Sequence, residues 1–229
     1  MNPANPVRVL LVDDHTLFRR GLAALLSRRP GIEVVGDAGD ALQALHQVAL
    51  LRPDVVLLDN HLPGASGIAV LPDLKAACPG LRVMMLTVSE DEDDLVRALR
   101  AGADAYLLKT ADGDDLVDAV VRVAAGESVL AEAMTGKLMA AFRQQPQALP
   151  PVRVQDLQDL SPREREILAA IGEGASNKEI ARRFDIAEST VKVHVQHLLR
   201  KLAASSRVQL AVIASSAGLG SGSPPVAHE

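Results

Sequence analysis

Cysteine and aromatic residues are almost missing from this chain of 229 residues, which holds one cysteine, no tryptophan, one tyrosine and three phenylalanines. A single cysteine excludes an intrachain disulfide, so we expect Cys78 to be a buried structural thiol in a reducing cytoplasm. Because aromatics make up only 2% of the residues, the hydrophobic cores must be built from Leu, Val, Ile and Ala.

Long apolar runs are also missing, since no segment approaches the length that a membrane span needs. The first residues lack the basic segment and apolar run of a signal peptide. We therefore expect a cytoplasmic protein without a membrane partner.

The net charge of −5 does not suggest a nucleic-acid binder, but the distribution of charge does. Residues 1–154 hold 15 basic and 20 acidic side chains, and residues 155–229 hold nine of each. Residues 176–207 include seven basic and three acidic side chains, so this segment has a net charge of +4. A local excess of this kind favours contact with phosphate groups.

Short apolar runs alternate with amphipathic segments over the first 125 residues. This alternation predicts an α/β fold, a flavodoxin-like doubly wound parallel sheet. The expected strands are 7–12, 32–36, 54–58, 82–87 and 104–108, and the expected helices lie near 15–28, 39–51, 66–78, 91–101 and 112–125. Ser89 and Glu92 have the spacing of a capping box at the fourth helix, where the acidic run 90–94 suits a helix N-terminus.

A helix is expected at 131–142, followed by a proline-containing linker over 143–156. The predicted organisation is a phosphoacceptor domain over 1–125, a helix and linker over 126–156, a small all-α DNA-binding domain over 157–217 and a disordered tail over 218–229.

Polar side chains stand at the end of four of the predicted strands or directly after it, and parallel strands bring such ends to one crevice. They are Asp13 and Asp14, Asp59, Thr87 and Lys109. Three carboxylates together require a cation, and Mg²⁺ suits oxygen ligands. A carboxylate can also attack phosphorus. The set therefore predicts a Mg²⁺-dependent phosphorylation site with Asp59 as acceptor and with Thr87 and Lys109 holding the phosphoryl oxygens.

Two helix starts and a turn precede a third helix in the C-terminal part of the chain. Ser161 and Glu164 form one capping box and Ser176 and Glu179 a second. These signals predict a helix-turn-helix whose third helix covers 188–202. Its core face carries Val191, Val195, Leu198 and Leu202. The residues expected to contact DNA are Lys178, Ser189, Thr190, Lys192, Val193, Gln196 and Arg200.

Residues 7–125 resemble the CheY-like receiver domain of two-component response regulators, on the segments LLVDDHTLFRRGL, LLDNHLPGASG and MMLTVSEDEDDLVRALRAGADAYLLK. The resemblance implies Mg²⁺ binding by Asp13, Asp14 and Asp59, phosphorylation of Asp59 by a cognate histidine kinase, and a switch role for Tyr106. Two departures are Asn60, where relatives usually have an aliphatic residue, and Leu62, which often corresponds to Met.

Residues 157–217 resemble the LuxR-type DNA-binding domain of the NarL/FixJ group. Gln196 stands where close relatives can have Lys, and Ala187 stands where relatives usually have Ser or Thr as helix N-cap. The last helix, with Val208, Leu210, Val212 and Ile213, resembles the segment through which these domains pair.

Together these features predict a response regulator that binds promoter half-sites in double-stranded DNA as a homodimer when Asp59 is phosphorylated. It is no enzyme, apart from its own phosphotransfer and dephosphorylation. The resemblance to the NarL group also implies that the receiver covers the third helix in the resting state. Two alternatives stay open: a DNA-binding regulator that works without phosphorylation, and a Mg²⁺-dependent phosphohydrolase with Asp59 as nucleophile.

Overall fold

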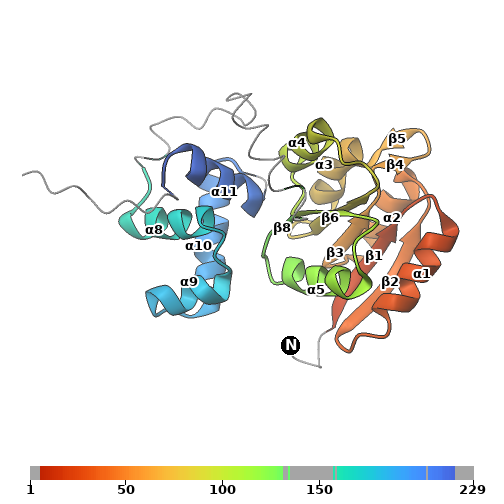
Figure 1. Cartoon of the computed structure of the whole chain (residues 1–229), viewed down its shortest axis with the longest axis horizontal. Helices are drawn as coiled ribbons and strands as arrows, with labels where there is room; N and C mark the ends of the chain where they lie inside the picture. The colour runs from red at the N-terminus through yellow and green to blue at the C-terminus, as the bar shows by residue number, and fades with distance from the viewer. Residues whose placement is uncertain (1–5, 131–133, 135–156, 158, 205, 220–229) are drawn as a thin grey trace, which may run out of the picture. The chain divides into compact units, whose positions relative to one another are not determined.

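The computed structural model describes residues 6–130, 134, 157, 159–204 and 206–219. The chain divides into two compact units, residues 1–148 and residues 149–229 (Figure 1). The helix expected at 131–142, apart from Met134, and the linker expected over 143–156 lie outside the described residues, as does most of the expected tail. No helix among the described residues is long and apolar enough to cross a membrane.

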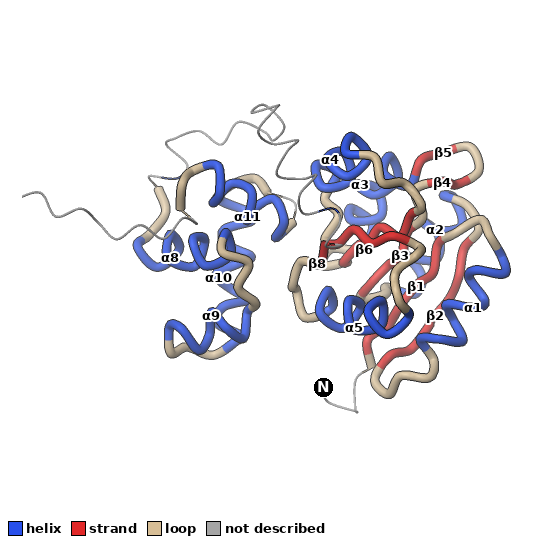
Figure 2. The backbone as a smooth tube through the Cα atoms, viewed as in Figure 1, coloured by secondary structure: helices blue, strands red, loops and turns tan. Residues whose placement is uncertain are grey.

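The first unit is built on a six-stranded parallel sheet (Figure 2). Its strand order, β2-β1-β3-β6-β7-β8, is the flavodoxin-like order with one strand added at the edge. The strands are β1 (Val7–Val12), β2 (Ile32–Ala38), β3 (Val55–Leu58), β6 (Arg82–Thr87), β7 (Ala105–Leu108) and β8 (Val129–Leu130). The predicted fold class is confirmed, and β1 and β6 have the predicted bounds.

Helices cover both faces of this sheet because its strands are apolar on both sides. Helices α1 and α5 pack through Leu22, Leu26, Leu116 and Val120 into one buried cluster with the strands. Helix α3 packs against α2 and α4. The helices are α1 (Thr16–Leu26), α2 (Ala41–Leu51), α3 (Gly67–Ala77), α4 (Glu92–Ala101) and α5 (Gly113–Ala124). Cys78, which caps the C-terminus of α3, is buried as predicted.

Three local features of this unit differ from the sequence predictions. A two-residue hairpin, β4 (His61–Leu62) with β5 (Ala65–Ser66), follows β3, and β8 extends the sheet. The cap of α4 is Asp91, whose side chain accepts a hydrogen bond from the Asp93 amide, and not Ser89 as predicted. The Ser89 hydroxyl is bonded to Asp94 instead, so the helix starts two residues later than a Ser89 cap would require.

In the described part of the second unit, helices pack around an aliphatic core. They are α8 (Pro162–Gly172), α9 (Asn177–Phe184), α10 (Glu188–Lys201) and α11 (Arg207–Ser216). Both predicted capping boxes are present, at Ser161 and at Ser176. Asp185 adopts a left-handed conformation with φ 51° and ends α9. Ala187 is the N-cap of α10 and offers no side-chain hydrogen bond, as predicted.

Candidate functional site

The carboxyl ends of four strands place the predicted pocket residues side by side. Asp59 lies next to the end of β1, because its amide donates to the Val12 carbonyl over 2.8 Å. Lys109 likewise lies beside the end of β6, with its amide 2.8 Å from the Thr87 carbonyl. Parallel pairing therefore gathers these residues at one edge of the sheet.

The Lys109 ammonium joins two of the carboxylates. Its Nζ lies 2.7 Å from Asp13 Oδ2 and 2.8 Å from Asp59 Oδ2. Both carboxylates are buried, with 3% and 2% of their residue surface exposed. Burial lowers the pKa of Lys109, but the hydrogen bonds to Asp13 and Asp59 outweigh this effect and raise it above its usual value. The ammonium also lies 4.9 Å from the centre of the Phe18 ring, so the lysine is held charged in the pocket.

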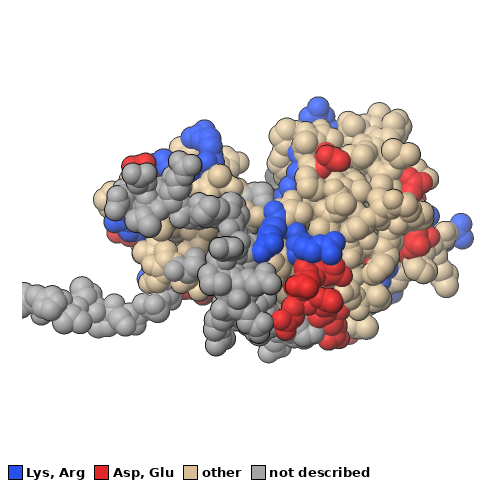
Figure 3. All heavy atoms as spheres, turned by 90° about the horizontal axis from the view of Figure 1, so that it is seen from above, with Lys and Arg blue, Asp and Glu red and all other residues tan. Residues whose placement is uncertain are grey.

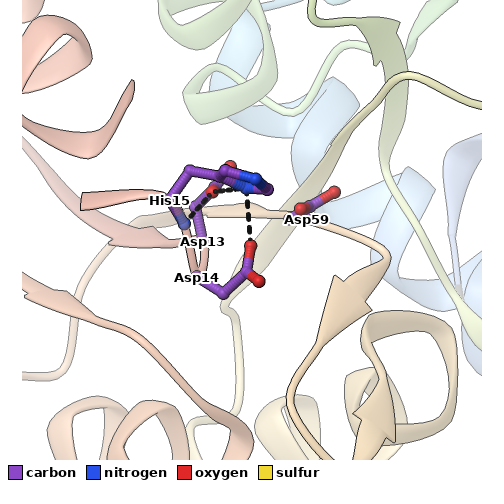
Figure 4. A group of neighbouring side chains, drawn as sticks. All are labelled: Asp13, Asp14, His15 and Asp59. Atoms are coloured by element: carbon purple, nitrogen blue, oxygen red, sulfur yellow. Dashed lines mark hydrogen bonds and ion pairs between the residues drawn. The ribbon is translucent and has the colours of Figure 1, made fainter. Parts of the chain in front are cut away.

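Asp14 and His15 complete the acidic edge of the pocket (Figure 4). Asp13, Asp14, His15 and Asp59 each offer a ligand atom, and these atoms all lie within 4.8 Å of one another. The sequence predictions did not include His15, although an imidazole next to two carboxylates is itself a metal-ligand signal.

One carboxylate oxygen in the pocket lacks a partner. Asp59 Oδ1 is buried and has no hydrogen bond among the described residues. An oxygen in this state is costly unless a cation or donor reaches it. The carboxylate donor set is the kind that Mg²⁺ prefers, so the residues present fit a magnesium ion.

Gly67, the first residue of α3, allows the chain to pass close to Asp59. A Cβ atom at this position would lie 2.0 Å from the Asp59 carbonyl oxygen. The Gly67 amide donates to the Asn60 carbonyl over 2.9 Å. The start of α3 is therefore packed directly on the backbone of the candidate acceptor.

Ser89, in the loop after β6, is hydrogen-bonded to both Thr87 and Tyr106. Thr87 Oγ1 accepts from the Ser89 amide over 3.1 Å, and the Tyr106 hydroxyl donates to the Ser89 carbonyl over 3.2 Å. Tyr106 is fully buried. Burial first, and then the charge of Asp94, raise the pKa of Tyr106 to about 12.

Asn60 connects two helix starts through its side-chain amide. Its Oδ1 accepts from Ser66 Oγ over 2.7 Å and from the Ile68 amide over 3.4 Å, while its Nδ2 donates to Asp94 Oδ2 over 3.4 Å. The Ser89 hydroxyl donates to the same Asp94 oxygen over 2.9 Å. The residue after Asp59 is thus bonded to the start of α3 and to α4.

Charged side chains gather on α4 itself. Glu92 and Asp93 begin the helix, and Arg97 and Arg100 follow, all four exposed. Figure 3 shows acidic and basic side chains side by side on one face of the first unit. The acids stand at the helix N-terminus, where the helix dipole favours them.

In the second unit, all seven residues expected to contact DNA are exposed. Val193, which has 48% of its surface exposed, lies on α10 among the polar positions Lys192 and Gln196. The core residues Val191, Val195, Leu198 and Leu202 are buried as predicted. Helix α10 therefore presents a polar face with one apolar side chain, which suits a groove of DNA.

Not all of the basic excess in 176–207 is available to phosphate. Arg207 is only 5% exposed, and its guanidinium donates to Asn177 Oδ1 and the Ala175 carbonyl over 2.7 and 2.6 Å. Lys201 lies 2.7 Å from the buried Glu164. Burial raises the pKa of Glu164, but the hydrogen bonds from Lys201 and Ser161 outweigh it and lower this pKa to about 2.

Helix α11 contributes to the core of its own unit. Leu210 and Ile213, two of the four residues expected in a pairing segment, are buried with α8 and α10 residues in this core. Their packing inside the unit stabilises its fold.

Two family models match the chain. Residues 9–121 match the response regulator receiver domain, and residues 158–214 match the LuxR family of bacterial regulatory proteins. The chain is 44% identical to the nitrate/nitrite response regulator protein NarL of Escherichia coli, over 93% of this chain and 96% of that protein. It is 41% identical to the DNA-binding transcriptional activator DevR/DosR of Mycobacterium tuberculosis, over 91% and 94%.

Solved structures agree with these matches. The response regulator ChrA of a heme-sensing two-component system is 35% identical, with a TM-score of 0.50 over 94% of this chain and 99% of that one. A LuxR-family response regulator from Aurantimonas is 31% identical, with a TM-score of 0.57 over 60% and 98%.

Proposed function

Because this chain belongs to the two-component response regulators, which join a receiver domain to a LuxR-type DNA-binding domain and regulate transcription, we propose that a histidine kinase phosphorylates it on Asp59. The observation that carries the proposal is the bridge from Lys109 to Asp13 and Asp59, which leaves Asp59 Oδ1 without a partner among the residues described.

In this reaction an Asp59 oxygen forms a bond to phosphorus while the bond from phosphorus to the kinase histidine breaks. Lys109 and the Thr87 hydroxyl hold the phosphoryl oxygens. Asp13, Asp14 and Asp59 hold Mg²⁺, which when bound offsets the negative charge of the phosphoryl group. Water later hydrolyses the acyl phosphate in the same pocket, so the only chemistry is the chain's own phosphorylation and dephosphorylation.

The exposed face of the second unit binds double-stranded DNA. Lys192, Val193 and Gln196 contact base edges, and Arg200, Lys178, Ser189 and Thr190 contact the backbone. One such unit covers little DNA, so two copies bind two half-sites as a homodimer in the cytoplasm.

Phosphorylation controls this binding. The phosphoryl group adds a charge of roughly −1.5 to −2 beside Thr87 and Lys109. Drawing the Thr87 hydroxyl inward breaks its bond with the Ser89 amide and changes the loop that also bonds Tyr106. The altered loop then changes how tightly the chain binds DNA.

The test is acetyl phosphate with Mg²⁺, read by mass spectrometry of the intact protein. Wild type gains one phosphate, Asp59→Asn gains none, and Asp73→Asn, at an exposed aspartate of α3, behaves as wild type. After this treatment, promoter DNA binding rises in wild type but not in Asp59→Asn. Equal binding by Asp59→Asn and phosphorylated wild type would indicate a regulator independent of phosphorylation, and turnover of external phosphate esters would indicate a phosphohydrolase.

A further inference from the structure

His15 places an imidazole nitrogen at the acidic edge of the pocket. Its Nδ1 lies 2.7 Å from Asp14 Oδ1 and 3.4 Å from Asp13 Oδ1 (Figure 4). His15 is the N-cap residue of α1, but its side chain makes no capping hydrogen bond. The ring is therefore directed to the carboxylates for a reason other than the start of the helix.

These separations match those between ligands of one metal ion. Ligand atoms at about 2.1 Å from a shared transition metal lie about 3 Å from one another. The two distances from Nδ1 to the carboxylates fall on either side of this value. A single ion can consequently contact the ring nitrogen and both oxygens after small movements of the His15 and Asp14 side chains, which are less buried than Asp13.

Lys109 contacts one oxygen of each of two carboxylates, and the His15 amide donates to the other oxygen of Asp13 over 2.8 Å. The lysine contacts Oδ2 of Asp13 and Oδ2 of Asp59, while His15 Nδ1 lies near the other oxygen of Asp13. The other oxygen of Asp59, a residue with 2% of its surface exposed, is buried without a hydrogen-bond partner in the described part of the chain. This buried oxygen is independent evidence that the pocket is built for a cation.

We propose that His15 is a fourth metal ligand, so that the pocket binds a first-row transition metal ion in preference to Mg²⁺. The proposal rests on the proposed carboxylate metal site and adds its selectivity. Carboxylates alone suit Mg²⁺, whereas imidazole binds Co²⁺, Ni²⁺ and Zn²⁺ more strongly. A nitrogen ligand thus raises the affinity of a carboxylate pocket for transition metal ions.

The test compares Co²⁺ and Mg²⁺ binding by the full, tag-free chain in isothermal titration calorimetry. The variant is His15→Phe, which keeps a ring but has no nitrogen at an exposed position, and the matched control is His61→Phe, at an exposed histidine of β4. A second readout is the proton NMR spectrum with Co²⁺, in which a ligating imidazole gives a strongly shifted exchangeable N–H signal.

We expect Co²⁺ affinity to fall at least about tenfold in His15→Phe, because even a residue that only supports a ligand contributes that much. Mg²⁺ affinity stays as in wild type, the shifted signal disappears, and His61→Phe retains both. If His15→Phe binds Co²⁺ as wild type does, or if wild type lacks the shifted signal, His15 is no ligand and the carboxylate site stands. If wild type binds neither ion, both the metal site and this selectivity are wrong.

Discussion

Replacing Gly67 by alanine tests whether the contact between α3 and the candidate acceptor is as close as the structure shows. The new Cβ would lie 2.0 Å from the Asp59 carbonyl oxygen, where ordinary contact begins at 3.4 Å, so one of the two must move by 1.4 Å. The obstructing atoms are backbone atoms of Asp59 and Asn60, and a backbone cannot yield as a flexible side chain does.

The expected loss of stability has three contributions. Overpacking costs about 1–3 kcal/mol, and weakening the bond from the Gly67 amide to the Asn60 carbonyl costs about 1 kcal/mol. Alanine restricts the unfolded chain more than glycine does, and this effect offsets about 0.4–1 kcal/mol of the lost stability. We expect Gly67→Ala to lower the free energy of unfolding of the first unit by about 2 kcal/mol.

The chain offers both a selective assay and a matched control. Tyr106 is the only tyrosine and tryptophan is absent, so intrinsic fluorescence during urea unfolding reports the first unit alone. A Cβ atom added to Gly21, inside α1, would meet no other atom within 4 Å, and Gly21→Ala should therefore stabilise the unit by about 0.4–1 kcal/mol. Stabilisation by Gly67→Ala as well would refute the reasoning.

Three further predictions concern caps, ion pairs and pH. Ala187→Ser should stabilise the second unit by about 1 kcal/mol, because it supplies the missing cap of α10; an unchanged transition in helical circular dichroism would contradict this. Lys201→Met should destabilise the same unit by about 1–2 kcal/mol, because it leaves the buried Glu164 carboxylate with fewer donors. The control is Lys192→Met, which removes an exposed ion pair and should change the free energy of unfolding by less than about 0.5 kcal/mol. For Tyr106 the pKa of about 12 exceeds the ordinary 10.0, so its contribution to stability is full below pH 10.0 and is lost as the pH rises toward 12; tyrosinate absorbance with a midpoint near 10 in the folded protein would show the burial argument to be wrong.

The alternation of apolar runs and amphipathic segments was enough to predict the sheet and the residues gathered at its edge. Asp13, Asp59, Thr87 and Lys109 each directly end or follow a strand, and strand ends of a parallel sheet meet whatever the details of packing. The hairpin of β4 and β5 escaped prediction because two-residue strands have no detectable period.

Side-chain partners could not be predicted in the same way. Arg207 was counted with the basic residues, yet it is buried against Asn177, thirty positions away in the chain. Ser89 has the spacing of a cap, but Asp91 provides the cap, and the Ser89 hydroxyl is hydrogen-bonded to Asp94 instead. Such choices depend on contacts that sequence patterns do not encode.

The amide of Asn60 has a mechanical consequence. An aliphatic residue there would make no hydrogen bond to either helix start, whereas this side chain uses its oxygen for Ser66 and its nitrogen for Asp94. Since Asn60 is covalently joined to Asp59, a small rotation of that peptide changes hydrogen bonds of two helices at once. Events at the acceptor can thus reach α3 and α4 simultaneously through one short side chain, without rearranging the aliphatic core between them.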